Sequence, residues 1–319
     1  MEVRVLSLVT NREARFYKQQ VAALEARGVE VDTIEIDGWR DADSDNVERR
    51  TPLDYVRFYG TALRSSLDGY DLVHASYGLT APAAALQRGK PSVVTLWGSD
   101  LMGVAGPLSK LAVRGVDEVV VMSTEMAEEL GRPCTIIPHG IDTDRFRPTD
   151  RAEARAELGW EDADDVFHVF FPYSPDRPIK DYPRAERIVE AAGRRLDADV
   201  RLQTVTGVPH EEMPTYYNAA DALLLTSERE GSPNSVKEAL ACNLPVVSTD
   251  VGDVAERLRD VDPSMVGRTD EELVDGLVDV LRRGERSNGR VMVDDIDLET
   301  QVDRLYRVYQ RAIDGHSGD

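Results

Sequence analysis

The chain has 319 residues, of which 41% are hydrophobic and 30% are charged, and its formal net charge at pH 7 is -21. This hydrophobic share excludes a disordered chain, and the length predicts two domains of similar size because single cores rarely exceed about 250 residues. A charge this negative, with no basic tract, argues against binding of nucleic acid or anionic lipid through charge alone.

Short apolar runs alternate with longer amphipathic stretches from the start of the sequence. We expect a strand at Val3 to Val9, a helix at about Glu13 to Arg27 and a strand at Val29 to Ile36. This order is typical of parallel sheets that helices cover on both faces. The rhythm continues with four further expected strands, at Asp71 to Ala75, Ser92 to Leu96, Glu118 to Met122 and Thr135 to Pro138.

A second series of the same kind starts after the break at Pro148 to Asp150. It opens with a short helix near Ala152 to Leu158 and an acidic turn. Two doubly wound, Rossmann-like parallel-sheet lobes follow from the pattern, with a junction near Pro138 to Asp150. The expected strands of the second lobe are Val166 to Phe171, Val200 to Val205, Ala222 to Thr226 and Pro245 to Thr249.

The last expected helix runs from about Leu298 to Ile313. Five apolar side chains share one of its faces by the i, i+3, i+4 rule: Val302, Leu305, Tyr306, Tyr309 and Ile313. We expect this helix to cross back over both lobes. The predicted organisation is therefore an N-terminal domain at 1–148, a C-terminal domain at 149–296, and a crossover helix with its tail at 297–319.

The turn after the first strand holds Thr10, Asn11 and Arg12 instead of the glycines of a GxGxxG motif. This argues against a dinucleotide-dependent oxidoreductase.

The basic residues are mostly arginine, because the chain has only five lysines among 38 basic residues: Lys18, Lys90, Lys110, Lys180 and Lys237. A carboxylate-rich, lysine-poor surface resembles that of proteins from salt-loving organisms, in which molar salt screens self-repulsion. We interpret the composition as that of a halophilic archaeal protein. An acidic interaction surface is the alternative, which the spread of acids along the chain disfavours.

The two cysteines, Cys134 and Cys242, lie in different apolar segments, and no Cys/His cluster has the spacing of a metal site. We expect buried thiols, no metal and no cofactor. The first residues, MEVRVLSLV, lack the pattern of a signal peptide, and no apolar run reaches the roughly 18 residues of a membrane helix. These features predict a cytoplasmic protein and leave peripheral membrane association open.

The segment TSEREGSPNSVKEALACNLPVVSTDVGD combines a turn with a helix expected at Pro233 to Ala241, with Ser232 as N-cap. A helix start presents free N–H groups to an anion, and Gly231 permits close approach of a ligand. Glu230 lies just before this helix and Glu238 lies inside it. The six residues from Ser232 to Glu238 rise roughly 9 Å along the helix axis. The segment therefore suits a diphosphate at the helix start, with one carboxylate meeting a sugar at one end of the diphosphate and the other meeting a ribose.

The two glutamates and their surroundings resemble the family 4 retaining glycosyltransferases of the two-lobed GT-B type. The similarity extends to most of the chain. DEVVVMSTEMAEEL and IIPHGIDTDRFRP resemble the end of that family's acceptor lobe and its crossover, VPHEEMPTYYNAADALLLTS resembles the stretch before the glutamate motif, and VVTLWGSDL resembles an acceptor-lobe loop. The resemblance implies an acceptor-binding first lobe and a second lobe that binds a nucleotide-sugar donor.

In this family an Arg and a Lys hold the donor diphosphate, and Arg177 and Lys180 in FFPYSPDRPIKDYP match them, although at shorter spacing. The resemblance implies that these cations stabilise the leaving diphosphate while Glu230 orients the transferred sugar. Glu238 would bind the ribose, with no side-chain nucleophile and no metal. The other donor-binding residues that it implies are Gly231, Ser232, Pro233, Asn234, Val208 and His210.

The alternative interpretation of Lys180 is a solvated loop cation. Lysine is rare in this chain, however, which favours a phosphate contact. Lys237 is expected to face solvent. The acidic run at Asp41 to Asp45 resembles a DxD metal motif, and we interpret it as a solvated loop because it lacks the residues of a calcium loop.

The acceptor lobe departs from the family pattern. Trp97 stands where many members have His, so it is either a wall of the sugar site or a core residue. Gly98 and Arg15 are expected at the acceptor site, and Asp100 either binds an acceptor hydroxyl or caps the following segment. The remaining candidates are Asn11 and Arg12 near the cleft, His74 as a hydrogen-bonded structural histidine, and His139 in the crossover turn.

The sequence thus predicts a glycosyltransferase with a UDP-, GDP- or ADP-linked donor and a glycan, polysaccharide or lipid-linked acceptor, and no nucleic acid partner. The alternatives are a GT-B epimerase or phosphorylase and a nucleotide-sugar-binding subunit without activity.

Overall fold

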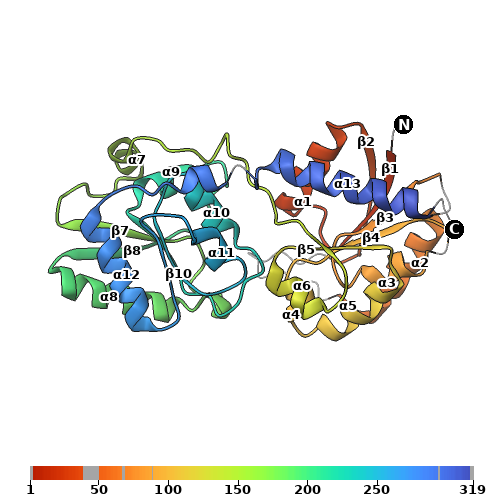
Figure 1. Ribbon diagram of the computed structural model, residues 1–319, viewed down its shortest axis with the longest axis horizontal. Helices are drawn as coiled ribbons and strands as arrows, with labels where there is room; N and C mark the ends of the chain where they lie inside the picture. Colours follow the sequence, from red (N-terminus) through yellow and green to blue (C-terminus); the bar gives the residue numbers. More distant parts are fainter. Residues whose placement is uncertain (1–2, 39–49, 67–68, 88, 294, 317–319) are drawn as a thin grey trace. The chain divides into compact units, whose positions relative to one another are not determined.

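The computed structural model describes residues 3–38, 50–66, 69–87, 89–293 and 295–316 (Figure 1). The chain forms two compact units, one of residues 1–140 with 298–319 and one of residues 141–297. Each unit contains its own parallel sheet with helices on its faces, which confirms the fold class predicted from the alternating pattern.

The sheet of the first unit has six strands in the order β2-β1-β3-β4-β5-β6, and all of their pairings are parallel. Its strands are β1 Val3–Val9, β2 Val29–Glu35, β3 Leu72–Ala75, β4 Ser92–Thr95, β5 Glu118–Val121 and β6 Thr135–Ile136. Its helices are α1 Arg15–Glu25, α2 Pro52–Ser65, α3 Ala81–Ala85, α4 Ser99–Met102, α5 Gly106–Ala112, α6 Thr124–Leu130 and α13 Leu298–His316, with a 3-10 turn, η1, at Val113–Gly115.

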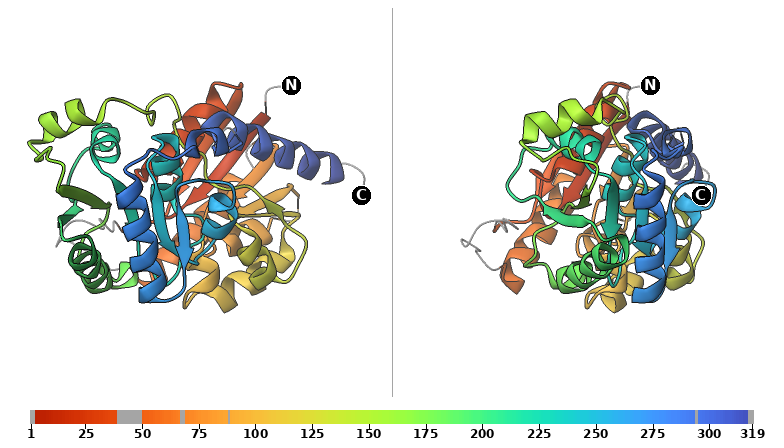
Figure 2. Two further views of the ribbon diagram at one scale, coloured as in Figure 1. Left: turned by 60° about the vertical axis from the view of Figure 1, so that its left-hand side comes forward. Right: turned by 90° about the vertical axis from the view of Figure 1, so that its left-hand side faces the viewer.

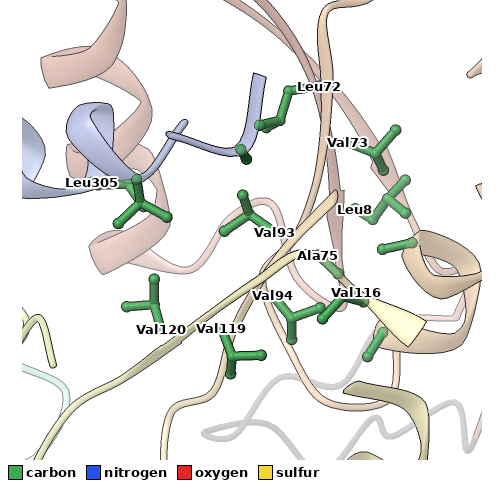
Figure 3. Close-up of a cluster of buried hydrophobic side chains, with 14 of the residues drawn as sticks. Leu8, Leu72, Val73, Ala75, Val93, Val94, Val116, Val119, Val120 and Leu305 are labelled. Carbon is green, nitrogen blue, oxygen red and sulfur yellow. The ribbon is translucent and has the colours of Figure 1, made fainter. Parts of the chain in front are cut away.

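The C-terminal helix α13 packs within the first unit, beside α1 (Figures 1 and 2). Val302, Leu305 and Tyr309 are buried on its inner face as expected, and Val308 and Ala312 join them. Figure 3 shows Leu305 on the same side of the sheet as Val93 and Val120. Successive strand residues point to opposite faces, so the apolar runs of β3, β4 and β5 fill the core on both sides of the sheet.

The sheet of the second unit has five strands in the order β11-β10-β9-β7-β8, again with parallel pairings. Its strands are β7 Val166–Phe171, β8 Asp199–Thr204, β9 Ala222–Leu225, β10 Val246–Thr249 and β11 Met265–Gly267. Its helices are α7 Arg151–Leu158, α8 Tyr182–Leu196, α9 Met213–Ala219, α10 Asn234–Ala241, α11 Val254–Leu258 and α12 Asp270–Arg283, with 3-10 turns η2 Pro178–Lys180 and η3 Gly289–Met292.

Local sequence signals define several helix ends in this unit. Helix α12 starts with a capping box between Thr269 and Glu272 and stops at Gly284, whose φ of 60° suits a residue without a side chain. Helix α7 has the Asp150 side chain as its N-cap. Loop residues that follow β7, β9 and β10 all lie at the carboxyl edge of the sheet, where open α/β sheets bind ligands.

The thiol of Cys242 is buried, whereas that of Cys134 is partly exposed. The expectation of two buried thiols was therefore wrong for Cys134, which lies in the short loop between α6 and β6 at the sheet edge. Among the described residues, no helix combines the length and apolar character that crossing a membrane requires.

Candidate active site

Helix α10 lies at the centre of the predicted donor site. It begins at Asn234, one residue later than expected, with Pro233 in an extended conformation as its N-cap. Ser232 does not cap the helix, because its hydroxyl donates to Asp253 Oδ2 at 2.7 Å. The helix start is thereby tied to the loop after β10.

Glu230 lies in the turn before α10 and accepts two side-chain hydrogen bonds on Oε1. One comes from the Lys180 ammonium and the other from the Ser227 hydroxyl at 2.7 Å. The Lys180 side chain is 5% exposed and that of Glu230 is 16% exposed, so the ion pair is largely shielded from water. The structure therefore brings together two residues that are 50 positions apart in the sequence.

Tyr173, two residues after the end of β7, packs against this ion pair. The Lys180 Nζ lies 3.7 Å from the centre of its ring, and the Arg177 guanidinium carbon lies 5.8 Å from it. The Tyr173 hydroxyl is hydrogen-bonded to Ser235 in the first turn of α10. Burial lowers the pKa of Lys180, an effect that the Glu230 carboxylate opposes. The exposed Arg177 and the buried Lys180 thus share one aromatic support.

Glu238, in the middle of α10, has both carboxylate oxygens engaged. His210 Nε2 lies 2.8 Å from Oε1, and the buried Tyr217 hydroxyl donates to Oε2 at 2.8 Å. The His210 ring packs against Phe146 with 4.9 Å between ring centres. The side chain of Glu238 is therefore held in one orientation by α9 and by the loop that contains His210.

Two buried polar atoms at this site have no hydrogen-bond partner among the described residues: His210 Nδ1 and Asn234 Oδ1. Buried polar atoms are usually paired, so atoms of this kind are candidates for contact with a ligand. Val208 lies two positions before His210 in the same loop and is half-buried.

Lys237 is 1% exposed, so the expectation that it faces solvent was wrong. Burial lowers its pKa to about 8, and Asp253 opposes the shift. Helix α10 is buried along nearly all of its length, which leaves no solvent face for Lys237.

Both halves of the chain match family models. Residues 14–145 match the model described as Glycosyltransferase Family 4, and residues 181–283 match the one described as Glycosyl transferases group 1. In both halves the chain is therefore similar to glycosyltransferases, family 4-like in the first and group 1-like in the second.

Several curated relatives resemble this family 4-like chain. A D-inositol 3-phosphate glycosyltransferase 1 of Catenulispora acidiphila is 27% identical over 316 residues, which cover 78% of this chain and 74% of the relative. A putative teichuronic acid biosynthesis glycosyltransferase, TuaC of Bacillus subtilis, is 30% identical over 213 residues, 58% of this chain and 54% of TuaC. A lipopolysaccharide core biosynthesis mannosyltransferase, LpsB of Rhizobium meliloti, is 30% identical over 46% of this chain and 49% of LpsB. The match thus spans about half the length of the last two relatives.

Solved structures share the fold of both units at low sequence identity. A sucrose-phosphate synthase from Thermosynechococcus elongatus has a TM-score of 0.75 at 19% identity and covers 98% of this chain and 100% of its own. Anabaena HepE in complex with UDP-glucose has a TM-score of 0.67 at 15% identity and covers 97% and 99%. At these identities the likeness concerns the fold.

The predicted acceptor residues lie at the carboxyl edge of the first sheet. Trp97 packs against the core of the first unit. The centre of its ring lies 4.6 Å from that of Phe16 and 5.7 Å from that of His139. Its indole N–H donates to the Ser76 carbonyl at 2.8 Å. Trp97 is partly buried. His139 is buried in this cluster.

Asp100 is fully buried and accepts hydrogen bonds from the backbone N–H groups of Trp97, Gly98 and Gly78. It therefore holds the turn around Gly98, whose φ is 116°, and none of its side chain is exposed. The expected capping of the following segment is not seen, because Asp100 lies within α4 and accepts from N–H groups that precede this helix and from the loop after β3.

Other candidates of the first unit have separate roles. His74 is the hydrogen-bonded histidine that was expected, between Thr95 and Tyr309. Arg12 pairs with Glu35, and the exposed Arg15 begins α1. The acidic run at 41–45 lies outside the described residues. Within those that are described, no group of His, Cys, Asp and Glu side chains has the arrangement of a metal site.

Sequence reasoning missed Tyr173, Tyr217 and Gly252. Gly252 has a φ of 57°, and a Cβ there would lie 2.5 Å from the Gly231 carbonyl oxygen. Only the glycine in the sequence VGD signalled such a close approach. The two tyrosines gave no signal, because aromatic residues after or between strands are usually core residues.

Proposed function

We propose that this protein is a retaining glycosyltransferase that moves a hexose-type sugar from a nucleotide-sugar donor to a glycan, polysaccharide or lipid-linked acceptor. The observation that carries the proposal is the arrangement around α10, with Glu230 paired to Lys180 at one end and Glu238 held by His210 and Tyr217 further along. Carboxylates in such fixed positions accept hydrogen bonds from sugar hydroxyls.

The donor binds across the start of α10. Lys180 and Arg177 contact the diphosphate, together with the backbone N–H groups of the first turn and the Asn234 amide. Glu238 accepts from the ribose hydroxyls, with its orientation set by its two side-chain donors. Tyr173 keeps both cations at the level of the diphosphate.

Transfer breaks the bond between the anomeric carbon and the leaving diphosphate oxygen, which takes the electron pair. Lys180, Arg177 and the helix start stabilise the negative charge that develops there, while the sugar ring becomes oxocarbenium-like. The acceptor hydroxyl attacks on the face from which the diphosphate leaves, and the departing phosphate takes its proton. Glu230 orients the sugar through its hydroxyls, and neither a side-chain nucleophile nor a divalent metal takes part.

The comparisons support the donor class. HepE was solved with UDP and with UDP-glucose, which makes UDP-glucose the first donor to test. The names of the relatives include a lipopolysaccharide core mannosyltransferase and inositol phosphate glycosyltransferases. Lipid-linked glycans and inositol phosphate are therefore the first acceptors to test.

Thermal-shift measurements with UDP-, GDP- and ADP-sugars in potassium chloride identify the donor, because a ligand that binds the folded chain raises its unfolding temperature. Release of nucleoside diphosphate that needs both donor and acceptor, and persists in the presence of a chelator, then confirms transfer. Donor binding without turnover for any acceptor would favour a nucleotide-sugar-binding subunit instead.

A further inference from the structure

Lys237 of α10 is a buried cation that the proposed reaction does not use. Its side chain is 1% exposed, although a lysine is seldom fully buried unless a partner compensates its charge. Burial lowers the pKa of Lys237 to about 8, and the nearby carboxylate that most favours its charged form is that of Asp253. Asp253, in the loop after β10, is therefore the principal partner of the Lys237 charge.

Asp253 connects this buried charge to the turn that precedes α10. Its side chain is 5% exposed. Its Oδ2 accepts a hydrogen bond from the Ser232 hydroxyl at 2.7 Å and another from Arg257 Nε at 3.2 Å. A charged acceptor holds a hydroxyl more firmly than a neutral one does. Ser232 lies only two residues after Glu230, so the carboxylate holds the turn close to the candidate sugar contact.

The loop that contains Asp253 also packs directly on the backbone of this turn. A Cβ added to Gly252 would lie 2.5 Å from the Gly231 carbonyl oxygen and 3.2 Å from that of Glu230. The loop therefore contacts the turn twice, through the backbone at Gly252 and through the side chain of Asp253. A displacement of the loop would displace the turn that carries Glu230.

A purely structural ion pair is the competing explanation for the buried charge. Replacement of a buried ion pair by apolar side chains is often neutral or stabilising, so stability alone gives little reason for a charge at this position. The surroundings within α10 also suit an apolar residue, because Val236, Ala239 and Leu240 are all buried. A need to hold the turn in one position explains the lysine better.

We propose that Lys237 is a positioning residue that acts through Asp253 on the turn from Glu230 to Ser232. Side chains on a helix lean toward its N-terminus, which directs Lys237 toward this turn. With the turn fixed, the Glu230 carboxylate keeps one orientation. The consequence for sugar transfer rests on the proposed function, in which Glu230 orients the transferred sugar, whereas the consequence for the turn itself does not.

Hydrogen exchange followed by mass spectrometry tests the positioning without any ligand. Lys237→Met removes the charge and keeps a long apolar side chain, and Asp253→Asn weakens the acceptor. Each variant is expected to speed exchange in peptides that cover residues 228–233 roughly tenfold, while peptides from β7 and α8 exchange as in the wild type. The double variant is expected to match the single variants, because both changes remove the same interaction.

Lys110→Met is the matched control, because Lys110 is a partly exposed lysine of the first unit. It is expected to leave exchange in residues 228–233 unchanged. The positioning role is overturned if Lys237→Met and Asp253→Asn exchange like the wild type there, or if Lys110→Met has the same effect as Lys237→Met.

Kinetics test the consequence for transfer. Lys237→Met and Asp253→Asn should each lower kcat roughly tenfold or more, because a misplaced Glu230 no longer orients the sugar. Binding of UDP, measured by calorimetry, should stay as in the wild type. Loss of thermal stability together with weaker UDP binding would indicate a structural role instead. Faster exchange with an unchanged kcat would overturn the link to transfer. A wild type without turnover would contradict the proposed function, and the exchange measurement would still decide the positioning.

Discussion

The ion pair between Lys180 and Glu230 leads to a quantitative prediction about donor binding. A diphosphate that binds Lys180 competes with the Glu230 carboxylate for the same ammonium group. Hydrogen bonds to charged groups contribute about 1.5–3 kcal/mol, and Glu230→Gln keeps a neutral acceptor, so roughly 1–2 kcal/mol of this competition is removed. Because each 1.4 kcal/mol is about tenfold in affinity, the variant should bind free nucleoside diphosphate roughly 5–30-fold more tightly.

The intact nucleotide sugar should not gain in the same way, because Glu230→Gln also weakens the contact to the sugar hydroxyls. We therefore expect the ratio of nucleotide-sugar to nucleoside-diphosphate affinity to fall, and turnover to fall by roughly a hundredfold or more. Isothermal titration calorimetry with UDP and UDP-glucose measures both affinities. Glu228→Gln is the control, since it removes an exposed carboxylate from the same loop. Equal or weaker binding of the diphosphate to Glu230→Gln would refute the reasoning.

Three further predictions concern the supports of the site and the core. Tyr217→Phe removes a buried hydroxyl that donates a hydrogen bond to Glu238, so the KM for the nucleotide sugar should rise about tenfold with kcat unchanged. Steady-state kinetics that show mainly a lower kcat would contradict this. Gly252→Ala places a Cβ 2.5 Å from the Gly231 oxygen, so it should lower kcat/KM at least tenfold and reduce thermal stability. Gly284→Ala is the control, because Gly284 has a similar φ but open space around it, and this variant should reduce stability alone. Burial lowers the pKa of His74 to about 3, so the unfolded chain binds a proton there between pH 6.5 and 3 and the folded chain does not. The corresponding stability, at most roughly 5 kcal/mol, is present above pH 6.5 and lost as pH falls, and urea titrations should show a flatter pH dependence for His74→Asn.

The strand pattern was predictable because parallel strands buried on both faces are short, continuous apolar runs. Val3–Val9 and Val166–Phe171 match the expected bounds, and most other strands differ by one or two residues. The strand Met265–Gly267 was missed, because three residues at a sheet edge carry no periodic signal. Helix α2 also gave no expectation, although Thr51 and Asp54 form a capping box at its start.

The donor side of the candidate site was predictable as a set of residues but not as a set of contacts. Lys180 was identified because it matches a lysine of the family, and the rarity of lysine in this chain supported a phosphate contact. The same rarity gave no correct expectation for Lys237, which is buried. Burial of a charged side chain depends on its neighbours in space, and Asp253 is 16 positions away. The support of Lys180 by the Tyr173 ring is likewise a tertiary contact that no sequence spacing encodes.

The two units differ in how their polar groups are used. In the second unit, three segments hold α10 and the turn before it through side chains. Tyr173 contacts Ser235 and Tyr217 contacts Glu238 in the helix, and Asp253 contacts Ser232 in the turn. Such fixed contacts suit a ligand part that does not vary, as the nucleoside diphosphate does not. In the first unit, the corresponding edge presents the aromatic rings of Phe16 and Trp97, and the polar groups of Asp100 and His74 are turned inward to hold the backbone and the core. A ring face recognises shape and apolar surface more than a particular hydroxyl pattern. For the proposed transfer reaction, we therefore expect acceptor choice to depend on residues outside the glutamate motif.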